Sequence, residues 1–176
     1  MRAPIGHFDD ALPATERREL LPPPVAAAVT AEMIHVDTDP AKADTAVFVA
    51  TYGEELLRES ANCVVVAGRR GQDVTLAACL VLSTTRVDVN GVVRRHLGAR
   101  KASFASMDTA VGATGMEYGG ITAVGLPADW PLLIDAAVAD TPWVLIGSGA
   151  RRGKLIVPGK VLAALPGAVV LENLGI

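Results

Sequence analysis

Residues 63–82 read CVVVAGRRGQDVTLAACLVL, two apolar runs separated by the polar, glycine-bounded segment GRRGQD. Apolar runs that flank a turn of this composition are typical of a β-hairpin. A turn centred on Gly71 places Cys63 opposite Cys79, within cross-strand reach. That pairing allows a disulfide, but two packed, reduced thiols are the favoured alternative in a reducing compartment. Asn62 then points away from the face that carries Cys63.

Shorter elements are expected on both sides of the hairpin. Asp44 or Thr45 caps one helix, and Asp88 or Asn90 caps another that stops at Gly98. Four later apolar segments are expected as strands: Pro131–Asp135, Trp143–Ile146, Leu155–Val157 and Ala168–Leu171. Short helices mixed with hairpin-connected strands predict an α+β domain around a mixed, strongly curved central β-sheet.

The composition indicates a single globular domain. The 176 residues are 51% hydrophobic and 20% charged, which is enough apolar material for a core. The longest apolar run, Leu76–Leu82, is far shorter than the roughly 20 residues of a membrane span. The first residues carry acids and arginines where a secretory signal needs an apolar segment, so we expect a cytoplasmic protein with no membrane partner. Residues 1–24, rich in proline, are expected to form an N-terminal arm and residues 25–176 the domain.

Charge is distributed unevenly along the chain, whose net charge is −3. Residues 1–60 hold 11 acids and 5 bases, whereas residues 61–176 hold 8 acids and 11 bases. Two basic clusters lie in the second part: Arg86, Arg94, Arg95, Arg100 and Lys101 in one, and Arg151, Arg152 and Lys154 in the other. Such clusters can meet phosphates. The alternative is a solvated face whose arginines pair with nearby acids.

Familiar catalytic signatures are absent from the sequence. It contains no GxSxG elbow, P-loop or HExxH motif, and no GxGxxG in a strand-to-helix setting. Its three histidines are scattered, and its two cysteines lack metal-ligand spacing. We therefore expect no metal and no cofactor. The aromatic content of 4% also disfavours a stacking platform for single-stranded nucleic acid.

Two glycine-rich segments are the candidate ligand-binding loops. Residues 115–127 read GMEYGGITAVGLP, and residues 147–152 read GSGARR directly after an apolar run. Glycines let a backbone approach a ligand closely and expose its N–H groups as donors. The alternative is a pair of crossing loops whose glycines only satisfy positive φ angles.

The order of several short motifs resembles that of the YbaK/EbsC family. The motifs are Lys101–Ala105, Thr114–Gly115, Gly119–Thr122, Gly125–Pro127, Leu133–Asp135, Gly147–Gly149 and Lys154–Leu155. The family includes aminoacyl-tRNA deacylases related to the editing domain of bacterial prolyl-tRNA synthetases. The resemblance covers roughly residues 33–174 and leaves the N-terminal arm outside it.

The resemblance implies hydrolysis, in trans, of the ester between a wrong amino acid and the 3′ end of its tRNA. The partner is then the acceptor end of a mischarged tRNA. The residues with an implied catalytic role are Asn62, Gly119, Gly120 and Thr122. The residues implied to bind the aminoacyl group are Ile121, Asp135, Gly147, Ser148 and Gly149. The residues expected to meet tRNA phosphates are Arg94, Arg95, Lys101, Arg151, Arg152 and Lys154.

Two positions depart from the family pattern. Asn62 stands where family deacylases carry a lysine, and Ala123 stands where a proline follows the Gly-Gly-Ile-Ser/Thr motif. A carboxamide can donate a hydrogen bond to a carbonyl or a ribose hydroxyl, but it brings no positive charge. Three functions remain open: an aminoacyl-tRNA deacylase, a module that binds the charged tRNA end without hydrolysis, and a hydrolase of another small ester or amide.

Overall fold

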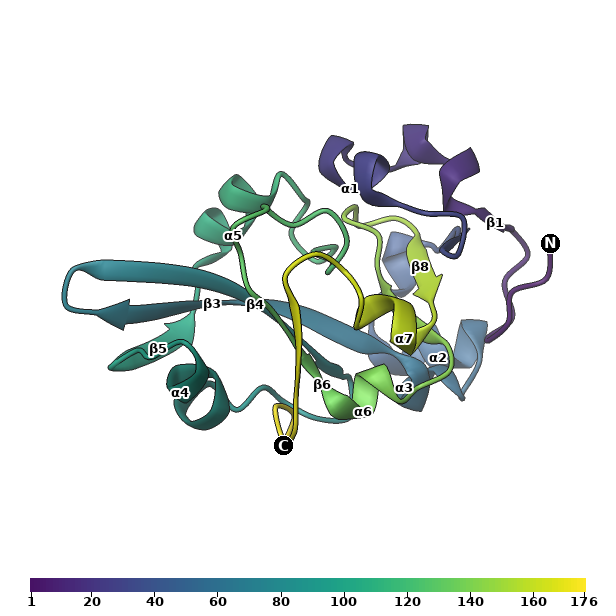
Figure 1. Cartoon of the computed structure of the whole chain (residues 1–176). Coiled ribbons are helices and arrows are strands. Elements are labelled where there is room, and N and C mark those ends of the chain that lie inside the picture. The colour runs from purple at the N-terminus through teal and green to yellow at the C-terminus, as the bar shows by residue number, and fades with distance from the viewer.

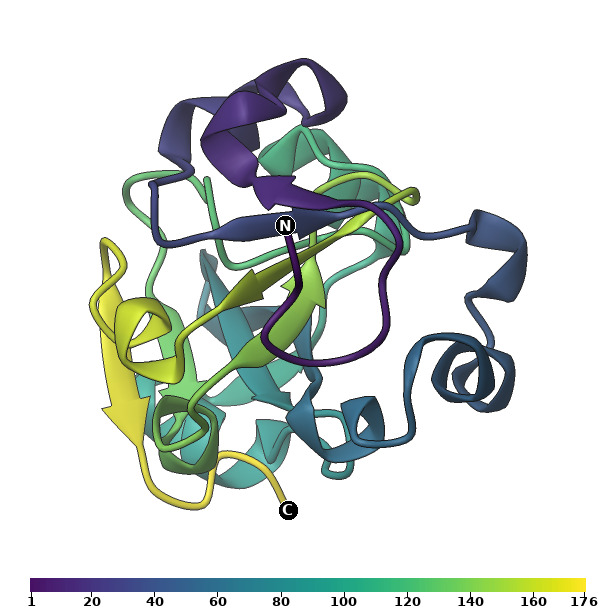
Figure 2. The same cartoon turned by 90° about the vertical axis from the view of Figure 1, so that its right-hand side faces the viewer.

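The structure, a computed structural model that describes all 176 residues, has an α+β fold with two β-sheets (Figures 1 and 2). An antiparallel sheet has the order β1-β2-β8-β7, with bounds Ala11–Pro13, Ile34–Val36, Lys154–Val157 and Val144–Gly147. A mixed sheet has the order β5-β3-β4-β6-β9, with bounds Lys101–Phe104, Ala61–Arg70, Asp73–Leu82, Leu132–Asp135 and Ala168–Leu171. The α+β class is confirmed, but the strands form two sheets where one strongly curved sheet was expected.

Seven short α-helices connect and flank the strands. They are α1 Pro23–Ala28, α2 Thr45–Tyr52, α3 Leu56–Glu59, α4 Arg94–His96, α5 Met107–Thr114, α6 Ala136–Ala139 and α7 Gly159–Leu162. The Asp44 carboxylate accepts hydrogen bonds from two N–H groups at the start of α2, as expected for a cap. Asp88 caps the π-helical turn Val89–Val93 that leads into α4. None of these helices has the length and apolar character needed to cross a bilayer.

The β3–β4 hairpin is present, but its register differs by one residue from the expected one. Arg70 pairs with Asp73, so the turn consists of Gly71 and Gln72 and is not centred on Gly71. The φ of +62° at Gly71 is the value that a two-residue turn with glycine first requires. Cys63 consequently lies opposite Leu80, and Cys79 lies opposite Val64.

This register places the two thiols on opposite faces of the sheet. Cys63 packs against the main core, whereas Cys79 lies in a second cluster beneath the other face. Both cysteines are free, which agrees with the favoured alternative of reduced thiols. Burial raises the pKa of each thiol to about 12, so both stay protonated at neutral pH.

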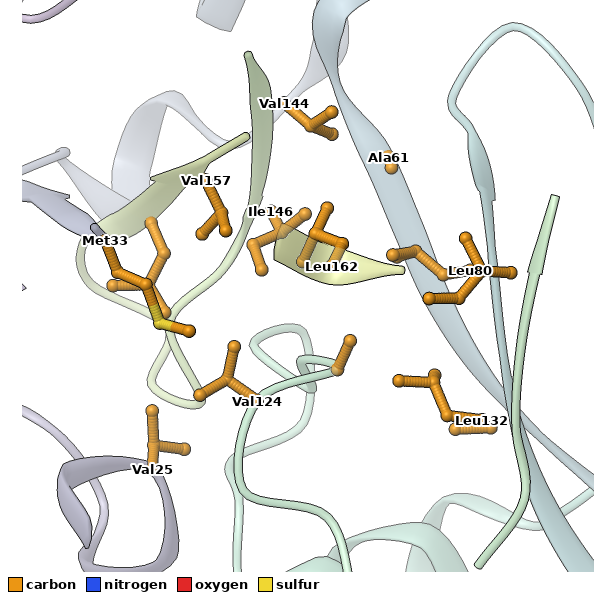
Figure 3. Packing of buried hydrophobic residues seen from close by; sticks show 14 of the residues in the cluster. Val25, Met33, Ala61, Leu80, Val124, Leu132, Val144, Ile146, Val157 and Leu162 are labelled. Atoms are coloured by element: carbon orange, nitrogen blue, oxygen red, sulfur yellow. The ribbon is translucent and has the colours of Figure 1, made fainter. Parts of the chain in front are cut away.

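The main core fills the space between the two sheets (Figure 3). Its side chains come from both sheets and from the connecting loops, as Ile146, Leu80 and Val124 illustrate. The sheets approach each other where the residue before β3, Ser60, forms an isolated parallel bridge with Leu145 of β7. The first residues of β3 therefore lie beside β7, at a junction between the two sheets.

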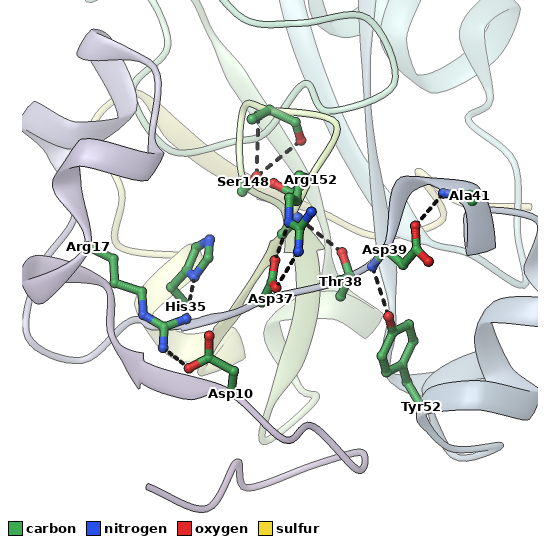
Figure 4. A network of polar contacts seen from close by, with 12 residues as sticks. Asp10, Arg17, His35, Asp37, Thr38, Asp39, Ala41, Tyr52, Ser148 and Arg152 are labelled. Atoms are coloured by element: carbon green, nitrogen blue, oxygen red, sulfur yellow. Dashed lines mark hydrogen bonds and ion pairs between the residues drawn. The ribbon is translucent and has the colours of Figure 1, made fainter.

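Residues 1–24 supply the edge strand β1 of the antiparallel sheet. β1 pairs with β2, and Ala14 and Leu21 are buried in the main core. The buried Arg17 side chain forms an ion pair with Asp10, and its Nη1 lies 3.1 Å from Nδ1 of the buried His35 (Figure 4). The division of the chain into an arm and a domain at residue 24 stays a prediction.

The environment of His35 predicts that stability falls on acidification. Burial and the adjacent Arg17 guanidinium lower the pKa of His35, so the folded state resists its protonation. The unfolded chain then binds more protons as the pH falls below about 6.5, and the free energy of unfolding decreases. We expect the substitution His35→Gln to reduce this loss between neutral pH and about pH 5, as measured by urea denaturation. The exposed His96→Gln serves as control, and an equal acid loss in wild type and H35Q would contradict the assignment.

Candidate functional site

An open cavity of about 490 Å³ lies at the junction between the start of β3, the strand β7 and the helices α2 and α3. Six residues that the sequence singled out line it: Asn62, Gly119, Ile121, Gly147, Arg151 and Lys154. The carboxamide before the hairpin and both glycine-rich loops therefore face one space. Its volume falls within the range of about 300–1,000 Å³ that is usual for small-molecule sites.

The two glycine-rich loops pack backbone against backbone beside the cavity. A Cβ at Gly120 would overlap the carbonyl oxygen of Ala150, and one at Gly147 would lie 2.7 Å from the Gly120 oxygen. The Gly149 N–H donates to the Gly120 oxygen at 2.7 Å, and the Glu117 N–H donates to the Gly149 oxygen at 2.8 Å. Close approach of two backbones, which excludes side chains, is thus the reason for glycine at positions 120 and 147.

Three residues of the first loop that line the cavity have a free N–H group. The N–H groups of Tyr118, Gly119 and Ile121 donate to no acceptor in the protein. Gly119 has a φ of +83° and open space at its Cβ position, so at this position glycine serves the backbone conformation and not packing. The loop therefore has three unpaired main-chain donors beside the cavity, of which those of Gly119 and Ile121 flank Gly120.

The edge of β3 supplies another donor and an acceptor. β5 pairs with β3 only from Val66 to Arg69, and beyond that ladder the Ala105 N–H donates to the Val65 oxygen. Because backbone groups alternate in direction along a strand, the N–H and C=O of Cys63 point to the same side as those of Val65. No strand pairs with Cys63 on that side, and Cys63 lines the cavity. The cavity is thus bordered by an unpaired strand edge.

The polar side chains at the cavity are mainly cationic or neutral. Asn62 is exposed and its carboxamide has no partner within the protein. Lys154 of β8 is half-buried, forms no ion pair, and burial lowers the pKa of its ammonium group. Arg151 is exposed, and Asp39 is the one carboxylate in the lining. The cavity therefore favours an electron-rich or anionic ligand group.

The remaining expected site residues lie outside the lining. The Ser148 hydroxyl is buried and bonds to the carbonyl oxygens of Ala150 and Arg152, so it shapes the second loop (Figure 4). The Arg152 guanidinium is paired with the Asp37 carboxylate at 2.7 and 2.8 Å. Gly149, with a φ of +89°, also belongs to this loop.

Thr122 and Asp135 lie deeper in the fold. Thr122, within the first loop, is fully buried, and its hydroxyl has no partner. Asp135 ends β6 and lies next to Gly175 of the C-terminal segment. Three further bases, Arg94, Arg95 and Lys101, lie on α4 and β5, toward the turn end of the hairpin. None of these residues lines the cavity.

The sequence reasoning missed the apolar wall of the cavity. This wall comes from α2, α3 and β7, and its members are Phe48, Val49, Leu56, Leu57, Leu145 and Ile146. The only signal in the sequence was the composition of α2 (TAVFVATY). A surface helix normally has a polar face toward solvent, and this segment has too few polar residues to form one. No sequence signal indicated that the main-chain groups of Cys63 are unpaired, because this depends on where β5 ends along β3.

Comparisons with known proteins point to one family. The sequence model described as "Aminoacyl-tRNA editing domain" matches residues 40–165. No curated protein matches the chain significantly.

Three solved structures share the fold. A scaffold protein from a study of computational epitope grafting has a TM-score of 0.70 at 21% identity, over 92% of this chain and 97% of its own. A candidate trans-editing enzyme for prolyl-tRNA synthetase has a TM-score of 0.66 at 21% identity, over 90% of each chain. A hypothetical protein has a TM-score of 0.66 at 19% identity, over 81% of this chain and 90% of its own. At such identities the likeness concerns the fold.

The packing of the two loops predicts a specific cost for a methyl group at position 120. We expect Gly120→Ala to lower the free energy of unfolding by about 1–3 kcal/mol, since its Cβ would meet the Ala150 backbone. Gly112→Ala is the matched control, because this glycine lies inside α5 with open space around it. Helix propensity predicts that G112A is neutral or stabilising. Urea denaturation that showed equal stabilities for the two variants would contradict the packing role of Gly120.

Proposed function

From the premise that this chain belongs to the aminoacyl-tRNA editing domain family, we propose that it is an aminoacyl-tRNA deacylase that acts in trans on mischarged tRNA. The observation that carries the proposal is the cavity, which combines free main-chain donors, unpaired cations and an apolar wall. An aminoacyl ester offers the matching groups: a carbonyl, ribose hydroxyls, a phosphate and an amino-acid side chain. The likeness to a candidate trans-editing enzyme supports the mode of action.

In the proposed reaction, water attacks the ester carbonyl carbon. The bond to the ribose oxygen then breaks, this oxygen takes the proton that the water gives up, and free amino acid and uncharged tRNA leave. The N–H groups of Gly119 and Ile121 stabilise the negative charge on the carbonyl oxygen in the transition state. Gly120 holds this loop in place through its backbone contact, and the buried Thr122 N–H donates to the Met116 sulfur within the loop.

Side chains of the cavity orient the ester and do not attack it. Asn62 donates to the carbonyl or to a ribose hydroxyl, and the α-amino group donates to the free carbonyl of Cys63. The Cys63 thiol, with its pKa raised to about 12, is not a nucleophile at neutral pH. No histidine lines the cavity, so the proposal relies on orientation and main-chain electrostatics.

The acyl group enters toward the apolar wall in this arrangement. Phe48, Leu56 and Leu145 favour an apolar aminoacyl side chain, because its burial there removes apolar surface from water. Gly147 leaves room beside the first loop, while Ser148 and Gly149 maintain the shape of the second loop. Arg151 and Lys154 face the phosphate of the terminal nucleotide.

One observation favours a second candidate, a module that binds the charged end of tRNA without hydrolysing it. Asn62 supplies no charge, and the cavity contains no histidine that could act as a general base. Binding without turnover would then be the function of the same surface.

A panel of mischarged tRNAs tests the deacylase proposal. We expect release of amino acid from at least one apolar aminoacyl-tRNA, and a fall of about three- to tenfold in kcat/KM for Asn62→Ala, because one hydrogen bond to the ester is lost. Asn90→Ala, an exposed asparagine outside the cavity, is the control and keeps full activity. No release above the rate without protein would remove the enzymatic proposal, and tight binding without release would support the binding module.

A second prediction concerns Lys154. We expect Lys154→Met to lower kcat/KM by about tenfold or more, since a charge-assisted contact contributes about 1.5–3 kcal/mol. Lys154→Arg keeps the charge and most of the activity. Because burial lowers the pKa of Lys154, wild-type activity declines with rising pH earlier than for a solvent-exposed lysine, whereas the decline in K154R is shifted to higher pH. An identical alkaline profile for wild type and K154R would contradict this role.

A further inference from the structure

The turn end of the β3–β4 hairpin carries a cluster of bases that the cavity does not use. We call it the hairpin-tip cluster, and its members are Arg69, Arg70, Arg94, Arg95, Arg100 and Lys101. All but the half-buried Arg94 are exposed. None of them is part of an ion pair, because the two ion pairs of the chain join Arg17 to Asp10 and Arg152 to Asp37. The alternative of a solvated face with paired arginines is therefore met in the exposure of these residues but not in their pairing.

Backbone contacts hold these bases together. Arg69 of β3 lies directly opposite Lys101 of β5, and the Arg100 N–H donates to the Arg69 oxygen at 2.9 Å. Arg70 extends to the end of α4, where its Nη1 donates to the Gly98 oxygen at 3.2 Å. The cluster is thus a fixed feature of the fold that joins the hairpin, α4 and β5 (Figure 1).

This arrangement is electrostatically unfavourable for the isolated protein. Like charges directly opposite each other on neighbouring strands are destabilising. The nearest acid along the hairpin, Asp73, is the register partner of Arg70 but forms no ion pair with it. A surface with this excess of bases raises the local concentration of a polyanion and is stabilised when one binds.

The position of the cluster relative to the cavity sets the length of a polyanion that would contact both. Asn62, at the cavity, and Arg69 lie on one continuous strand, at a spacing of about 23 Å for a rise of about 3.3 Å per residue. A ligand whose end enters the cavity and whose phosphates reach the tip must span that distance. The one exposed aromatic ring of β5, Phe104, lies at the other end of that strand, so the tip has no platform for stacking unpaired bases. Phosphates of a duplex fit this chemistry better than a single strand.

We propose that the hairpin-tip cluster binds the phosphates of the acceptor-stem duplex of the tRNA whose 3′ end occupies the cavity. This proposal rests on the proposed function for the identity of the RNA. The cavity recognises the aminoacyl end, and the hairpin recognises the duplex that carries it. The contacts at the tip are with phosphates, so they add affinity without reading the base sequence.

The test compares two triple variants of equal charge. The first, Arg69→Gln with Arg100→Gln and Lys101→Gln, removes half of the cluster. The control, Arg2→Gln with Arg18→Gln and Lys160→Gln, removes the same number of exposed bases that belong to neither basic cluster. Equilibrium binding of an uncharged tRNA is measured over a range of salt concentrations. We expect the first variant to flatten the slope of log K against log salt by about 2–3, and the control to leave it unchanged.

A kinetic arm separates this proposal from the proposed function. With full-length mischarged tRNA we expect the tip variant to raise KM about tenfold or more with kcat unchanged. With a short aminoacyl-CCA oligonucleotide, which has no duplex, its KM equals that of wild type. Failure of wild type and all variants to hydrolyse the oligonucleotide would count against the deacylase function. The salt dependence of tRNA binding would then still test whether the hairpin-tip cluster binds RNA.

Equal salt slopes for wild type and the tip variant would overturn the proposal, as would an equal effect of the two triple variants. If the triple variant does not fold, the single variants Arg100→Gln and Lys101→Gln provide the same test. Each is expected to reduce the slope by about 1.

Discussion

The backbone contact between the two glycine-rich loops is the constraint on which the candidate site depends. Gly120 lies against Ala150, and Gly147 lies against the carbonyl oxygens of Gly120 and Ile121. The first loop follows α5 and the second follows β7, so this contact connects the region next to the mixed sheet with the antiparallel sheet. Without it, the N–H groups of Gly119 and Ile121 would have no fixed position relative to Asn62.

The junction between the sheets explains why the cavity forms at the start of β3. β5 covers the edge of β3 only near the hairpin turn, and β7 approaches it only at the bridge between Ser60 and Leu145. Between these two partners, the edge at Cys63 is left open, and α2 and α3 close the space with apolar side chains. A strand longer than its neighbours thus creates both an unpaired edge and a cavity wall.

Local features of this fold could be predicted from the sequence, and long-range ones could not. The hairpin and the caps at Asp44 and Asp88 depend on neighbouring residues, so composition and spacing sufficed to predict them. The register of Cys63 depended on whether the turn has two or three residues, and a difference of one residue moved Cys79 to the other face. The division into two sheets follows from pairings between distant strands, for which the sequence has no local signal.

The site shows the same limit. Glycine-rich composition indicated both loops, and Asn62 came from the resemblance to a family. A family pattern gives positions along the chain but not the direction of a side chain, so it could not show that Asp135 and Ser148 lie outside the cavity lining. The apolar wall was missed because residues such as Phe48 and Leu56 have the same chemistry as core residues.

The open edge of β3 has a consequence for how such a pocket diverges. Main-chain groups are identical for every residue except proline, so the N–H and C=O groups of an open strand edge stay available to a ligand when the surrounding side chains change. An alanine scan of the pocket would leave this part of the recognition intact and undetected.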